Sequence, residues 1–341
     1  MRKTAEFQQS DALYYPLRGL EAIKALLILF LAVLLGGASV CAAPRPQKPE
    51  AERIRDAQQG LDLLLNGEID AALKIFGEIK ADNPDSPLGY LLEADAFCWK
   101  IYMTTGNLVD PDVFEVEPNS TSPYDAQFVK LVNEAISKSE ANIRSRQSVA
   151  KNHLYEGLAY ALRARLLAMR SSNLATVRSP RKMRSLLIKA LQEDPNLRDA
   201  YLGLGLYGYF VDTLPTIVRF LRLFIGLPGG SRKRGFEEIE YAAKNGELTR
   251  GEALFYLAKD YPRPNEEQFA TSLELFEQLQ SRYPRNALWT LLVGSMEIRL
   301  GHAEKGEAVY RELLNRTHTD QTEAGKAVYA AAQKALKNLR H

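Results

Sequence analysis

The chain has 341 residues, of which 46% are hydrophobic and 25% are charged, which is enough apolar material for a large buried core. Its formal net charge of +2 argues against a nucleic-acid-binding protein, because such proteins carry a basic excess that displaces counterions from phosphate. Two cysteines and four scattered histidines show neither a disulfide framework nor the spacing of metal ligands, so we expect no metal and no cofactor.

The first 42 residues have the composition of a targeting segment. Lys24 precedes an unbroken apolar run, residues 25–35, and small residues follow up to Ala42. Three interpretations stay open: a secretory signal cleaved after Ala42, an uncleaved N-terminal anchor, and lipid attachment at Cys41, although Val40 before it departs from the lipobox pattern. Each places the rest of the chain in the periplasm or the cell envelope.

A proline-rich spacer at residues 43–50 precedes a repeat domain that we expect to span residues 51–341. Apolar residues recur there at helical spacing, and Asn-Pro or similar breakers separate the helices. The expected helical hairpins pair residues 51–66 with 69–82, 87–104 with 125–144, 148–170 with 180–193, 197–211 with 232–244, 247–260 with 266–282, and 287–300 with 303–315. A last helix at 320–339 has no partner in this scheme and is expected to cap the array.

Two segments interrupt the helical pattern. Residues 105–124 contain three prolines and no periodicity; a loop of this length is either functional or mobile, and we expect a mobile loop because nothing in it resembles a ligand-binding loop. Residues 212–230 are an apolar insertion, within which the stretch 216–226 can form a helix that carries two arginines on one face and apolar residues on another: Val218, Arg219, Leu221, Arg222 and Ile225. Such a helix can lie on a membrane surface or pack inside the repeat array, and the sequence leaves both interpretations open.

Small residues recur at one position of the hairpins: Gly60, Ala94, Gly205 and Gly294. The first two lie one 34-residue period apart, and the other two hold the same place relative to the proline that closes the preceding repeat. With these small residues, the hairpins resemble tetratricopeptide repeats of exported bacterial proteins over most of residues 50–316. The resemblance implies an all-α, right-handed superhelix, or α-solenoid, of about six hairpins plus a C-terminal capping helix. Residues 198–243 are also faintly similar to the inclusion-body-clearance tetratricopeptide family.

Proteins of the tetratricopeptide family bind partners along the concave face of the array. The positions that would line this face carry mainly apolar side chains here, and the candidates are Leu61, Leu65, Leu91, Trp99, Leu202, Leu206, Tyr209 and Phe210. Either an outside protein partner occupies the groove, or the chain's own inserted segment fills it. Family members that clamp a terminal carboxylate use Lys and Asn at these positions, and this chain has neither.

We therefore predict a non-catalytic protein–protein interaction scaffold of the bacterial cell envelope. The alternative is a membrane-associated assembly factor that contacts lipid through residues 216–226 or through the N-terminus. No hydrolase or metalloprotease motif is present, and Cys98 lies in an apolar stretch expected to be core, so we expect neither an enzyme nor a small-molecule substrate.

Overall fold

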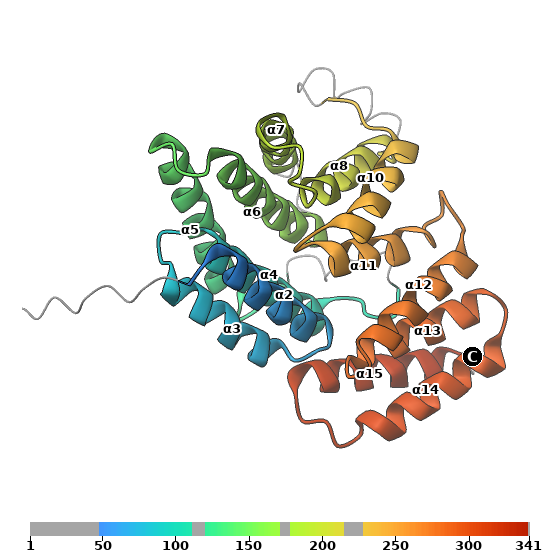
Figure 1. Ribbon diagram of the computed structural model, residues 1–341. Helices are drawn as coiled ribbons and strands as arrows, with labels where there is room; N and C mark the ends of the chain where they lie inside the picture. The colour runs from blue at the N-terminus through green and yellow to red at the C-terminus, as the bar shows by residue number, and fades with distance from the viewer. Residues whose placement is uncertain (1–47, 111–119, 171–177, 215–227, 340–341) are drawn as a thin grey trace, which may run out of the picture. The chain divides into compact units, whose positions relative to one another are not determined.

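Helices make up the regular structure of the computed structural model over the residues that it describes, which are 48–110, 120–170, 178–214 and 228–339 (Figure 1). These ranges contain thirteen α-helices and no β-strand, so the all-α class is confirmed. The helices are α2 (Glu50–Leu65), α3 (Ile69–Asp82), α4 (Leu88–Thr105), α5 (Asp125–Arg144), α6 (Val149–Met169), α7 (Arg178–Glu193), α8 (Ala200–Asp212), α10 (Arg232–Asn245), α11 (Arg250–Asp260), α12 (Phe269–Arg282), α13 (Ala287–Arg299), α14 (Ala303–Thr317) and α15 (Glu323–Asn338).

Each of these helices packs against the next one along the chain, and the first pair shows why. In α3, Ala72, Phe76 and Ile79 form one buried stripe at helical spacing. The partner position in α2 is Gly60, where a Cβ atom would lie 2.2 Å from Cε1 of Phe76. Glycine is therefore required for this approach, and Gly67, with φ of +84°, makes the left-handed turn between the two helices.

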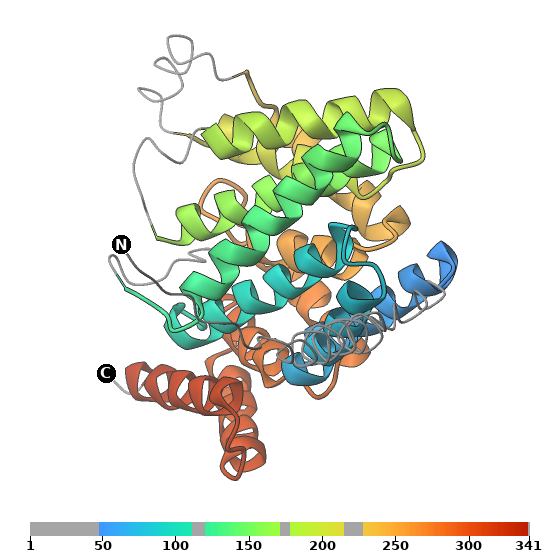
Figure 2. The ribbon, with the colours of Figure 1, turned by 90° about the vertical axis from the view of Figure 1, so that its left-hand side faces the viewer.

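Helices that are far apart in the sequence also meet. The first helix α2 contacts α11, and α4 packs against α2, α3, α5, α6 and α15. Two views show that α15 lies beside α13 and α14 (Figures 1 and 2). The sequence analysis expects no partner for the last helix, and this expectation is corrected: α15 contacts α13, α14 and α4, and Val328 and Ala332 are among its buried residues.

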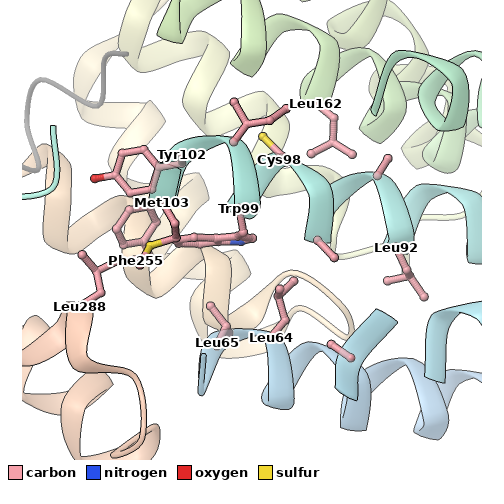
Figure 3. Packing of buried hydrophobic residues seen from close by; sticks show 14 of the residues in the cluster. Leu64, Leu65, Leu92, Cys98, Trp99, Tyr102, Met103, Leu162, Phe255 and Leu288 are labelled. Carbon is pink, nitrogen blue, oxygen red and sulfur yellow. The ribbon is translucent and has the colours of Figure 1, made fainter. Parts of the chain in front are cut away.

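An aromatic cluster lies in the core where these distant helices meet. Trp99 of α4, Phe255 of α11 and Trp289 of α13 have ring centroids between 5.1 and 6.1 Å apart. Figure 3 shows Trp99 between Leu64 and Leu65 of α2 on one side and Tyr102 on the other, with Phe255 beside Trp99. The large buried area of these rings makes a strong apolar junction between helices from distant parts of the chain.

Several sequence-based expectations fall on residues outside the described ranges. These are the targeting segment 1–42, most of the spacer 43–50, the middle of the loop 105–124 and most of the insertion 212–230. In the described first part of the loop 105–124, Leu108 is buried. Oδ1 of Asp110 accepts a hydrogen bond from Nη2 of Arg299 at 3.0 Å. Among the helices that the structure describes, none has the length and apolar character needed to cross a membrane.

Candidate binding cleft

A cleft of about 210 Å³ lies between α2, α4 and the start of α11. Leu61 and Leu65 of α2 line it together with Asp95 and Trp99 of α4. In each helix the two residues are four positions apart, which places them on one face, one turn above the other. The cleft therefore forms where one face of α2 meets the corresponding face of α4.

Glycine at position 251 brings α11 against this pair of helices. A Cβ atom at Gly251 would lie 2.2 Å from Cδ1 of Leu65, so a side chain there would push α11 away from α2. The next residue, Glu252, also lines the cleft. The missing side chain of Gly251 thus allows a carboxylate of α11 to approach the carboxylate of Asp95 on α4.

One arginine holds both carboxylates. Nη1 of Arg165, from α6, donates to Oε1 of Glu252 at 2.7 Å and to Oδ1 of Asp95 at 3.4 Å. The guanidinium carbon lies 5.1 Å from the Trp99 ring centroid and 5.7 Å from that of Tyr256, which is the geometry of cation–π contacts. The arginine is 7% exposed, so the two acids and their shared base form a largely desolvated cluster.

Burial and the negative charge of Glu252 together raise the pKa of Asp95 to about 8, although the positive charge of Arg165 acts in the opposite direction. Burial also raises the pKa of Glu252, again against the effect of Arg165. Two carboxyl groups on one guanidinium nitrogen repel each other, so this cluster favours a bound proton or a bound cation.

The thiol of Cys98 lies in the same helix as Asp95 but is buried, which agrees with its assignment to the core. Burial raises its pKa to about 12, with Arg165 acting in the opposite direction. A thiol with such a pKa stays protonated near neutral pH and is a poor nucleophile.

The structure places the predicted groove residues in different surroundings. Leu61, Leu65 and Trp99 line the cleft, although only Leu61 is more than slightly exposed. Leu91 is buried in the main core. The α8 candidates pack against α10 and α11 in a second apolar cluster, in which Leu202 and Tyr209 are buried while Leu206 and Phe210 are half-buried. The described residues therefore do not join all eight side chains into one open surface.

The five residues assigned to the apolar helix of the insertion, Val218, Arg219, Leu221, Arg222 and Ile225, lie outside the described residues. The sequence analysis does not single out Glu252, which lines the cleft, or Arg165, which binds the carboxylates of Glu252 and Asp95. Arg165 does carry a signal, because it follows Leu162 and precedes Leu166 and Met169 on the buried side of α6. A charged residue on an apolar stripe indicates a buried partner of opposite charge.

A second cleft of about 170 Å³ lies on the other side of the turn before α11. Glu247 and Leu248 line both clefts, and Nε2 of Gln58, which lines the first cleft, donates to the main-chain carbonyl of Glu247 at 3.1 Å. The turn is held by Asp199, whose Oδ1 accepts from three consecutive main-chain N–H groups. The position of this turn therefore shapes both clefts.

No protein-family model matches the chain, and no curated protein sequence is significantly similar to it. Within the described ranges, no three His, Cys, Asp or Glu side chains are grouped closely enough to hold a metal ion.

Proposed function

We propose that this chain is a non-catalytic protein–protein interaction scaffold of the bacterial cell envelope, and that it binds a segment of a partner protein at the cleft between α2, α4 and α11. The observation that carries this proposal is a match in register. Leu61 and Asp95 are 34 positions apart, as are Leu65 and Trp99, and all four line the cleft. Equivalent positions of two consecutive repeats thus contribute to it, and in tetratricopeptide proteins these positions face the partner.

The arrangement proposed for the described helices is a tetratricopeptide-like right-handed superhelix. Contacts between every helix and its successor support it, as does the placement of Gly60 and Gly294 against large side chains of the following helix, Phe76 and Tyr310. The location in the envelope rests on the apolar run and the small residues of the N-terminal segment.

The size of the cleft limits what it can hold. At about 30 Å³ for each water of the liquid, its volume corresponds to roughly seven waters. This space suits one large side chain or a short peptide stretch, and it is too narrow for a whole helix. We therefore propose that a single anchoring residue of the partner enters the cleft while neighbouring residues lie along the surface of α2.

Site-specific photo-crosslinking in the native host tests the proposal with the full-length chain. A photoreactive residue at Gln58, on the edge of the cleft, should give a specific adduct with one partner protein. The matched control carries the same residue at Val129 of α5, which is 48% exposed and does not line the cleft.

The variant Leu61→Gln should remove the adduct formed at position 58, because it places a polar amide on the apolar wall. Circular dichroism should show that this variant keeps its helices. Equal adducts at positions 58 and 129, or an adduct at 58 that Leu61→Gln leaves unchanged, would contradict the proposed site.

A further inference from the structure

The carboxyl group of Asp95 is short of hydrogen-bond donors. It lines the cleft although only 9% of the residue surface is exposed. Its Oδ1 accepts the long 3.4 Å bond from Arg165, and no group in the described part of the chain donates to its Oδ2. An ionised carboxylate can accept several hydrogen bonds, and burial without them is unfavourable. Asp95 therefore needs either a proton or a donor from outside the chain.

When both Asp95 and Glu252 are ionised, the described charged residues of the cleft and Arg165 leave an excess of one negative charge. Asp95 and Glu252 share the single positive charge of Arg165. The remaining charged residues that line the cleft are two acids and two bases, which balance one another: Asp62, Glu247, Arg250 and Arg282. A ligand with one positive charge would thus neutralise the cleft, whereas an anion would meet two carboxylates.

We propose, building on the binding function above, that the cleft takes the side chain of a lysine or arginine of the partner protein. Its ammonium or guanidinium group donates to Oδ2 of Asp95 and to the carboxylate of Glu252. Its aliphatic stem packs on Leu61, Leu65 and the edge of Trp99, as long basic side chains do on apolar surfaces. The three features that recognise it are the paired carboxylates, the apolar wall and a volume that suits one long side chain.

Binding of such a cation is coupled to release of a proton. Because the pKa of Asp95 is about 8, much of the unliganded protein carries a proton on this carboxyl at neutral pH. A bound cation favours the ionised form, so this proton leaves when the cation enters. The titratable and charged groups around Asp95 come from five helices and the residues next to them: Cys98 of α4, Asp62 of α2, Arg165 of α6, Glu247 of the turn, Arg250, Glu252 and Tyr256 of α11, Arg282 of α12, and Tyr283 directly after α12.

The ion pairs between α3 and α4 do not involve Asp95. Lys80 pairs with Glu93, and Asp70 pairs with Lys100 at 2.8 Å. These pairs give a control position for the cleft, since Asp70 is a carboxylate on a neighbouring helix and does not line it.

Calorimetric titration of the full-length chain with short blocked peptides tests the proposal. The probes are acetyl-Gly-Lys-Gly-amide, its arginine counterpart, the same peptide with an ε-acetylated lysine, and acetyl-Gly-Glu-Gly-amide. The lysine and arginine peptides should bind saturably, and the acetylated and acidic peptides about tenfold more weakly or not at all. Repeating the titration in buffers of different ionisation enthalpy should show proton release near pH 7 that vanishes near pH 9.5.

Variants then assign the effect to named groups. Asp95→Asn and Glu252→Gln should each lower the affinity for the lysine peptide by about tenfold. Asp95→Asn should also abolish the proton release. Asp70→Asn removes the same charge outside the cleft and should leave both affinity and proton release unchanged. Circular dichroism of each variant checks that it is folded.

The outcomes separate this inference from the function on which it rests. Equal binding of the lysine and ε-acetyl-lysine peptides, or absence of binding by both basic peptides, overturns the cationic ligand. If the Gln58 adduct with a partner persists in that case, the scaffold function stands alone. Free lysine or cadaverine bound as tightly as the peptide would instead point to a small molecule and overturn the partner side chain as the source.

Discussion

The indole Nε1–H of Trp289, in α13, donates to the main-chain carbonyl of Leu65 at the end of α2, with a distance of 3.0 Å. The two residues are 224 positions apart. Nδ2 of Asn286 donates to the same carbonyl at 2.9 Å, so the C-terminal end of α2 is fixed by the residues that begin α13. This relationship makes the first helix a part of the same packed unit as the sixth helical pair.

Replacing Trp289 with Phe should lower the free energy of unfolding by about 2 kcal/mol, since the variant loses one buried hydrogen bond and part of a fully buried ring. The Leu65 carbonyl keeps its bond from Asn286, which prevents a larger loss. Urea denaturation followed by far-ultraviolet circular dichroism measures the change.

Trp99→Phe is the matched control for Trp289→Phe. It removes the same atoms from the same aromatic cluster, but the indole N–H of Trp99 makes no hydrogen bond with the residues that the structure describes. The decrease in the free energy of unfolding for Trp99→Phe should therefore be smaller than that for Trp289→Phe by roughly 1 kcal/mol. Equal losses for the two variants would show that the bond to Leu65 adds nothing to stability.

Gly60→Ala should destabilise the protein by about 1–3 kcal/mol. The new Cβ would lie 2.2 Å from a ring atom of Phe76, and this ring is fully buried, so its displacement would disturb its neighbours in the core. Gly77→Ala in α3 is the control, because its Cβ would meet its nearest atom, on Glu93, at an ordinary 3.5 Å. That variant should gain about 0.5–1 kcal/mol from helix propensity. Thermal or urea unfolding measures whether each variant is less or more stable than the wild-type chain. A Gly60→Ala protein as stable as the wild-type chain would disprove the close approach of α2 and α3 at this position.

The helices and the positions of their small residues could be predicted from the sequence, because both depend on local spacing. Gly60 and Phe76 fall where the tetratricopeptide pattern expects a small and an aromatic residue, and the two positions are in close contact. The contact between Trp289 and Leu65 could not be predicted in this way. Its acceptor is a main-chain carbonyl, which every residue has, so no side-chain pattern marks it.

The candidate site could be predicted in part for a related reason. The tetratricopeptide pattern predicts that Leu61 and Trp99 lie on the partner-binding face, and both line the cleft. The charged centre of the cleft depends on Arg165 and Glu252, which are 87 positions apart and belong to no common repeat position. Their pairing results from the close approach of α11 that Gly251 allows, and this is a property of tertiary packing.

Asp199→Ala should lower the free energy of unfolding by about 2–4 kcal/mol. Oδ1 of Asp199 accepts from the main-chain N–H groups of Glu247, Leu248 and Thr249 at 2.8 to 3.0 Å, and from the Thr249 hydroxyl at 2.8 Å. Truncation leaves these donors before α11 without their acceptor. Asp199→Asn keeps an oxygen at this place and should lose only about 1 kcal/mol. Urea unfolding measures both, and a loss below about 0.5 kcal/mol for the alanine variant would mean that water replaces the carboxylate at no cost.

The stability of the protein should also depend on pH through Asp95. Its pKa rises from the ordinary 3.8 to about 8 in the folded chain, so the folded state binds this proton more tightly than the unfolded state does. The resulting stabilisation is complete below about pH 4 and is lost as the pH rises through 8. Asp95→Asn removes the titrating group. The free energy of unfolding of this variant, relative to that of the wild-type chain, should therefore rise by roughly 1–3 kcal/mol between pH 5 and pH 8.

The comparison with Asp70→Asn distinguishes this effect from the general pH response of the chain. Asp70 is exposed and pairs with Lys100, so Asp70→Asn removes the same charge from a solvated site outside the cleft. Urea unfolding at several pH values gives both differences directly. A constant difference for Asp95→Asn would mean that Arg165 alone keeps the Asp95 carboxyl ionised in the folded chain, and the excess negative charge of the cleft would then be present without a ligand.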